Sequence, residues 1–148
     1  MSFLGNLIWI IFGGLFMALG WLLSGLLMCL IIIGIPWAGS CFTLAQFSLA
    51  PFGKTIVLRS DLTGKEDLGT GDLGLVGNVV WFVFAGLWLA IGHVVAALAT
   101  ALTIIGIPFA WQHIKLARVA LAPIGKTVVT TREARLLSEK LGRPVSLI

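Results

Sequence analysis

The sequence predicts an all-α integral membrane protein formed by tandem duplication of a helical hairpin, and three observations support this fold class. Residues 6–57 align without a gap on residues 78–129, an offset of 72, with nearly half of the positions identical. Of the 148 residues, 59% are hydrophobic and 11% charged, which is unlike a soluble globular domain. No Asp, Glu, Lys or Arg occurs in residues 1–53 or 73–114, and each run exceeds the roughly 20 residues that span a bilayer.

The apolar run of each copy is long enough for two helices, because residues 4–49 are almost uninterrupted. We predict a turn at Ser24 and Gly25, with Ala96 and Ala97 as the weaker match in the second copy. The alternative is one long tilted helix over about residues 5–33, followed by a short interfacial helix. The polar residues after the second GIP motif favour this alternative: Gln112, His113, Lys115 and Arg118.

The GIP motif is predicted to break or kink the returning helix of each hairpin. Proline lacks the N–H of a helix hydrogen bond and clashes with the preceding turn, and a glycine two residues earlier loosens the same place. The helix-break residues are Gly34, Pro36, Gly106 and Pro108.

The distribution of basic residues favours two crossings per copy. All ten Lys and Arg residues lie either between Lys54 and Asp72 or from Lys115 onward. Basic loops stay in the cytoplasm, so an even number of crossings keeps both regions on that side, whereas a single crossing per copy exports one of them. We therefore expect a multi-pass protein with both repeats in the same orientation and with both termini and the basic regions cytoplasmic.

The segments after the apolar runs predict a small cytoplasmic β-ribbon and a C-terminal helix. APFGKT (residues 50–55) and APIGKT (122–127) suit a turn followed by β-branched residues. Thr130 and Glu133 have the spacing of a helix capping box, and Gly142 and Pro144 supply a stop. The predicted divisions are a first membrane repeat (1–57), a flexible loop (58–77), a second membrane repeat (78–129) and a cytoplasmic helix and tail (130–148).

Glycines within the apolar runs are predicted to form helix–helix contacts, because a missing side chain lets two helices approach closely. The candidates form two equivalent pairs: Gly14 with Gly86, and Gly20 with Gly92.

Polar side chains within or beside the apolar runs are candidates for lining a conducting path, because such residues are costly in lipid unless they face protein or water. The candidates are Asn6, Asn78, His93, Thr100 and Thr103. Each has a structural alternative: asparagine caps helices, threonine returns its hydroxyl to the preceding turn, and a histidine can be a hydrogen-bonded packing residue.

Catalytic chemistry is not indicated by this sequence. Its only histidines, His93 and His113, are twenty residues apart without a matching carboxylate in the apolar runs. The GKT triplets lack the glycine-rich lead-in of a phosphate-binding loop. We therefore expect no enzyme activity, no cofactor and no metal site, and the basic residues flank membrane segments instead of forming a nucleic-acid-binding module.

Four repeated motifs carry a family resemblance: the Gly13–Gly14 pair, LGW at residues 19–21, GIP, and LxPxGK at residues 49–54. The doubled arrangement resembles the YccF-like bacterial inner membrane component domain family over residues 6–126. The resemblance implies a small bacterial plasma-membrane protein without an assigned activity, and no catalytic residue is carried over. The second copy departs from the pattern at His93, which replaces the LGW tryptophan.

Two functions follow as hypotheses. The first is an oligomeric pore or small-ion or solute transport component, because two short hairpins do not enclose a wide path and the duplication supplies two similar faces. The second is a membrane scaffold or regulator that acts through its cytoplasmic loop and C-terminal helix. The expected partners are the lipid bilayer, further copies of the chain and, for the second hypothesis, a cytoplasmic protein.

Overall fold

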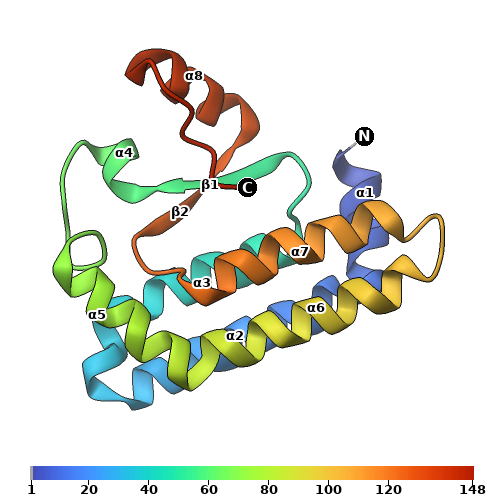
Figure 1. The fold of residues 1–148 in the computed structure, drawn as a ribbon, viewed down its shortest axis with the longest axis horizontal. Helices are drawn as coiled ribbons and strands as arrows, with labels where there is room; N and C mark the ends of the chain where they lie inside the picture. Colours follow the sequence, from blue (N-terminus) through green and yellow to red (C-terminus); the bar gives the residue numbers. More distant parts are fainter. Residues whose placement is uncertain (1) are drawn as a thin grey trace.

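The computed structural model describes residues 2–148, without the side chains of Ser2 and Ile33. Met1, where the first repeat is predicted to begin, lies outside the described residues. The first repeat folds as a hairpin with a long helix and a shorter returning helix (Figure 1). Its elements are α1 (Ser2–Trp9), the distorted turn η1 (Ile10–Gly14), α2 (Leu15–Leu30), the 3-10 turn η2 (Ile32–Gly34) and α3 (Ile35–Leu49).

The second repeat has the same organisation. Its elements are α5 (Asp72–Trp81), the π-helical turn η3 (Phe82–Gly86), α6 (Leu87–Ala101) and α7 (Ile107–Leu121). The predicted helical, duplicated architecture is therefore confirmed. The first part of α5 and the short helix α4 (Arg59–Thr63) lie within the segment for which the sequence predicts a flexible loop.

The predicted turn positions are wrong, because Ser24 and Gly25 lie inside α2 and residues 96 and 97 lie inside α6. The Ser24 hydroxyl donates to the Gly20 carbonyl at 2.8 Å, so this serine is satisfied within the helix. A Cβ on Gly25 would lie 2.9 Å from the Phe42 ring and 3.1 Å from Cβ of Cys41. Gly25 therefore allows α2 and α3 to pack closely and does not turn the chain.

The chain reverses at the GIP motif, which begins the returning helix instead of kinking it. Pro36 and Pro108 lie in the first turns of α3 and α7, where the N–H that proline lacks would have no helical partner. A Cβ on Gly34 or Gly106 would collide with a carbonyl in the last turn of the preceding long helix. The bounds of the helices are thus close to the alternative of one long helix followed by a short one.

The predicted ribbon is present as two antiparallel strands, β1 (Lys54–Leu58) and β2 (Lys126–Thr130). Ile56 pairs with Val128, the residue at the same position of the second repeat, and the flanking pairs are arranged symmetrically around them. Contacts between equivalent positions of two units are characteristic of a two-fold axis. A pseudo-two-fold axis relating the repeats therefore passes through the centre of the ribbon.

Helix α8 (Thr131–Leu141) follows β2 and has the predicted capping box and glycine stop. The Thr130 hydroxyl accepts from the Glu133 amide, the Glu133 carboxylate accepts from the Thr130 amide, and Gly142 ends the helix at φ 66°. The apolar side of α8 packs on the ribbon in a small cluster: Val57, Val129, Ala134, Leu137 and Val145. This face of α8 is therefore covered by residues of the same chain.

The two long helices lie side by side and run antiparallel. A Cβ on Gly20 of α2 would meet Leu89 of α6 at 3.1 Å, and one on Gly92 of α6 would meet Met17 of α2 at 3.4 Å. These contacts are again equivalent under the 72-residue offset. In Figure 1, α3 and α7 lie on one side of this pair, and the ribbon with α4 and α8 lies beyond them, which gives three layers.

Two helices are long and apolar enough to cross a membrane, Phe3–Leu30 and Asp72–Ala101. The returning helices α3 and α7 have 15 residues each, which at 1.5 Å per residue is about 22 Å. They are therefore shorter than the roughly 30 Å of a bilayer hydrocarbon core.

Candidate functional site

The first long helix is interrupted at Phe12 and Gly13. Gly13 has φ 107°, a value that residues with a Cβ rarely adopt. Its counterpart in the second repeat is Ala85, whose φ is not positive. At the interruption the Phe12 carbonyl accepts a hydrogen bond from Nε2 of His113 on α7, at 3.1 Å. The break therefore allows a main-chain carbonyl of the first repeat to accept a hydrogen bond from a side chain of the second.

Four groups form a hydrogen-bonded chain through the centre of the molecule. The Trp21 indole N–H donates to Nε2 of His93 at 3.2 Å. Because this nitrogen accepts, a neutral His93 carries its proton on Nδ1, from which it donates to Nδ1 of His113 at 3.1 Å. His113 then carries its proton on Nε2 and donates it to the Phe12 carbonyl. One pair of neutral tautomers, inferred from these partners, satisfies every member.

The chain is enclosed by aromatic side chains. Trp21, His93 and His113 have no exposed surface. The Trp9 ring lies over His113 with centroids 4.4 Å apart, and the Trp81 ring stacks on Trp21 at 5.4 Å. A fully satisfied polar network in such surroundings favours one packing of the core, because breaking any link leaves a buried polar group without a partner.

The network is built where the two repeats differ. His93 stands at the position of Trp21, and His113 at the position of Cys41. Equivalent residues that touch each other must lie on the symmetry axis, so the Trp21–His93 hydrogen bond marks that axis within the long-helix layer. The departure of the second copy from the LGW motif is thus the source of the polar centre.

Asn6 and Asn78 do not cap helices, so that interpretation is wrong. The Asn6 side chain donates to the Phe52 carbonyl at 3.3 Å and accepts from the Phe52 amide at 2.9 Å. Asn78 makes the same pair of bonds with Ile124, at 3.1 and 3.0 Å. Each asparagine therefore fastens the turn before a β-strand to the base of its own long helix.

The two threonine candidates bond to main chain nearby. The Thr100 hydroxyl donates to the Ala96 carbonyl at 2.8 Å, one turn earlier in α6. The Thr103 hydroxyl donates to the Thr100 carbonyl and accepts from the Gly106 amide at 3.0 Å. Of the five predicted path residues, the structure places only His93 in the central network, and it adds His113, Trp21 and Phe12.

The predicted packing glycines lie in two kinds of contact. Gly20 and Gly92 lie on the seam between α2 and α6 described above. A Cβ on Gly14 would overlap the Trp9 ring of the same long helix. One on Gly86 would lie 2.7 Å from Trp81 and 2.8 Å from the Ala120 carbonyl of α7, so Gly86 also lies at the predicted kind of helix–helix contact. These tryptophans donate across the hairpin to the carbonyls of residues 48 and 120, at 2.7 and 2.6 Å. Gly14 and Gly86 therefore make room for indole rings that join the two helices of each repeat.

The outer layer carries most of the charged residues. Arg59 pairs with Asp67 at 2.5 Å and holds the pKa of that carboxyl below its usual range. Arg143 pairs with Asp61 at 2.6 Å, and burial lowers the pKa of Lys126 in β2. A cavity of about 310 Å³ between the ribbon, α7 and α8 is lined by three cationic side chains, Lys54, Lys115 and Arg135, together with hydroxyl groups.

Comparison with known proteins agrees with the duplicated architecture. The family described as YccF, inner membrane component domain, matches residues 4–54 and again residues 76–126. Inner membrane protein YccF of Escherichia coli (strain K12) is 35% identical over 141 residues, which cover 93% of this chain and 94% of that protein. The protein of the same name in Shigella flexneri matches equally well, and no solved structure matches. This chain therefore belongs to the YccF family of inner membrane component domains.

Proposed function

We propose that this protein is a scaffold of the bacterial inner membrane, anchored by its two hairpins and acting through the layer formed by the ribbon, the linker and α8. The observation that carries the proposal is the separation of charge from the hairpins. Of its ten basic and six acidic residues, only Asp72, Lys115 and Arg118 lie on hairpin helices. The exposed side chains of the long helices are almost all apolar.

The polar layer has the order expected of a binding platform. The two ion pairs hold the linker and the segment after α8, and the Trp37 indole donates to the Leu68 carbonyl at 2.9 Å. Helix α8 keeps its outer face exposed, with Leu136 at 56% exposure. A fixed surface of this kind limits the conformational entropy lost when a partner binds.

Site-specific photo-crosslinking in living cells tests this proposal. We expect a photoreactive residue at Leu136, Arg132 or Lys65 to give discrete protein adducts. The matched control is Leu98, which is also well exposed, at 66%, but lies on α6, and which should react with lipid alone. The scaffold role is contradicted if the polar positions give no discrete protein adduct, or if Leu98 gives the same adducts as Leu136.

Small-ion transport by an oligomer is the second candidate, and the broken helix favours it. Transporter sites often use interrupted helices whose main-chain carbonyls lie beside ionisable side chains. The Phe12 carbonyl and the His93–His113 pair have this character. Purified protein in liposomes should then conduct an ion with a pH response that His93→Phe alters, provided that the variant keeps its fold. Absence of flux for several ions and pH values removes this candidate and leaves the scaffold.

A further inference from the structure

We propose that both hairpins are embedded in the cytoplasmic half of the bilayer, with α2 and α6 lying along the membrane plane, so that neither hairpin turn reaches the opposite surface. This inference uses the membrane location of the protein and is independent of the scaffold role. It assigns the exposed face of the long-helix pair to lipid acyl chains.

The symmetry of the repeats fixes the direction of the long helices relative to the two-fold axis. A two-fold rotation reverses the direction of a helix only when the helix is perpendicular to the axis. The long helices run antiparallel along the Gly20–Leu89 and Met17–Gly92 contacts, so they lie across the axis. The same axis passes through the ribbon at the Ile56–Val128 pair. Figure 1 shows the axes of α2, α3, α6 and α7 lying roughly parallel to one another, with the ribbon to one side.

The basic side chains on and beside the ribbon oppose long helices that cross the bilayer. If the long helices crossed the bilayer, the axis would lie in the membrane plane and the ribbon would lie level with the hydrocarbon core. Lys54, Lys126 and Arg59 would then be at a depth where a charged side chain costs at least about 2.5 to 3.5 kcal/mol. Turning the axis along the membrane normal places the ribbon, the linker and α8 in water together. It also satisfies the preference of basic segments for the cytoplasm.

The thickness of the two helix layers matches one leaflet of the bilayer. Packed helices are about 8–10 Å apart, so the two helix layers together are comparable in thickness to one leaflet with its headgroups, whose hydrocarbon half is roughly 15 Å. The lower layer, α2 and α6, then contacts acyl chains, and α3 and α7 lie near the headgroups. The exposed residues of α7 suit that level, because Trp111 and Arg118 are side chains that favour the interface.

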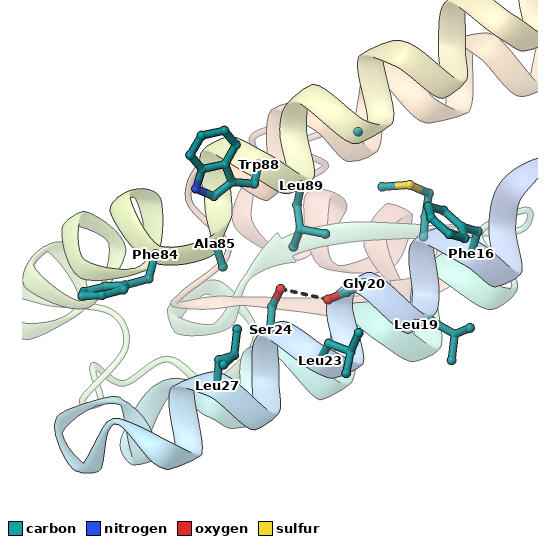
Figure 2. Close-up of a pocket in the computed structure, with 12 residues that line it drawn as sticks. Phe16, Leu19, Gly20, Leu23, Ser24, Leu27, Phe84, Ala85, Trp88 and Leu89 are labelled. Atoms are coloured by element: carbon teal, nitrogen blue, oxygen red, sulfur yellow. Dashed lines mark hydrogen bonds between the residues drawn. The ribbon is translucent and has the colours of Figure 1, made fainter.

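The groove between the long helices has the lining expected of a surface that contacts lipid. It has a volume of about 510 Å³ and is lined almost entirely by apolar side chains, among them Phe16, Leu23, Leu27, Phe84 and Trp88 (Figure 2). Its one hydroxyl, that of Ser24, already donates to Gly20. Apart from the indole N–H of Trp88, the side chains that line the groove offer no unpaired donor or acceptor, and such a groove on an uncharged face fits a lipid acyl chain.

Cysteine accessibility at the two hairpin turns tests the placement. Ile32 and Ile104 occupy equivalent positions in the two turns and are 80% and 88% exposed. Each is changed to Cys in a background with Cys29 and Cys41 replaced, and treated with a membrane-impermeant thiol reagent added to spheroplasts or to inverted vesicles. Gly64→Cys, in the linker, is the control for the cytoplasmic side, and labelling in detergent shows that every thiol is reactive.

We expect neither turn to react in spheroplasts, where Gly64→Cys is also protected, while Gly64→Cys reacts fully in inverted vesicles. Labelling of one turn but not the other in spheroplasts overturns the proposal in favour of antiparallel crossing helices. Labelling of both turns overturns it in favour of hairpins that cross twice. Each of these results is independent of whether the polar layer binds a protein, so the scaffold role stands or falls by its own crosslinking experiment.

Discussion

At the scale of single residues, the buried polar network at the centre of the molecule includes a hydrogen bond between two histidines that are twenty positions apart in the sequence. His93 and His113 are equidistant from residue 103, which lies in the turn between α6 and α7. A hairpin with its turn at GIP therefore brings them opposite each other. The predicted turn near residue 96 does not bring the two histidines opposite each other, so the pair is not predictable from that hairpin. The contact with Trp21 required knowledge of how the repeats meet, which no pattern within one repeat contains.

The histidine chain predicts a non-additive effect on stability. His93→Phe leaves the Trp21 N–H without an acceptor, and His113→Phe leaves the Phe12 carbonyl without a donor. Each unsatisfied buried group costs about 1–3 kcal/mol. Because each single variant also strands the other histidine, the double variant should lose less stability than the sum of the two. Unfolding in detergent measures this cycle, and strictly additive losses would show that the histidines are not coupled.

The asparagine pair predicts matched losses in both repeats. Asn6→Ala and Asn78→Ala each remove two hydrogen bonds to main chain, and typical net values near 1 kcal/mol per bond give roughly 2 kcal/mol for each variant. Gln46→Ala, on the exposed side of α3, serves as the control and should have little effect. The same unfolding assay applies. Equal stability of all three variants would mean that the asparagines do not fasten the turns.

At the scale of elements, the sequence correctly predicts the helix and the strands that are specified by neighbouring residues. The capping box of α8 and the β-branched residues after each turn specify their structures within a few positions, and both the helix and the ribbon are found. The position of the hairpin turn is harder to predict, because Ser24–Gly25 and GIP both contain turn-favouring residues and the two sites must be compared. In the structure Gly25 packs against Cys41 and Phe42 of α3 and lies inside α2. This contact joins residues of two different helices, so it is not visible in the local sequence around Gly25.

Glycine substitutions distinguish packing positions from exposed ones on these helices. Gly14→Ala should displace the Trp9 indole and its bond to the Ser48 carbonyl, with a loss of about 1–3 kcal/mol from overpacking. Gly39→Ala, in α3, meets no atom within 4 Å and should be neutral or stabilising by up to about 1 kcal/mol. Detergent unfolding compares the two directly. A Gly14→Ala variant as stable as Gly39→Ala would contradict the packing assigned to Trp9.

The capping box predicts how α8 responds to acid. The Thr130 amide and hydroxyl donate to the Glu133 carboxylate at 2.7 and 2.8 Å and lower its pKa. The ionised Glu133 carboxylate stabilises α8 fully when the pH is above the unfolded-state pKa of about 4.3. This contribution disappears as the pH falls through the lower pKa of the folded state. Hydrogen-exchange protection of α8 should therefore decrease in acid. Glu133→Gln should remove that decrease, and an unchanged acid response in this variant would assign it to another group.

At the scale of the whole molecule, the duplication and its membrane character could be predicted, whereas the way the repeats meet could not. Identity between residues 6–57 and 78–129 shows that the units are alike, but it carries no information about the direction in which they pack. The two-fold axis appears only in contacts between equivalent residues, such as Ile56 with Val128 and Trp21 with His93. Basic-residue counts predicted that both charged regions share one side, and the embedded placement achieves this without any crossing.

The most direct test of this placement is a depth measurement along α2 in lipid bilayers. Spin labels at Phe16, Leu23 and Leu30, all exposed on the long helix, report depth through relaxation by oxygen and by a water-soluble nickel chelate. A helix along the membrane plane predicts nearly the same depth at all three positions. A crossing helix predicts a steady change, because fourteen residues at 1.5 Å each span about 21 Å of the bilayer normal. A gradient of that size would contradict the embedded placement, and a flat profile would support it.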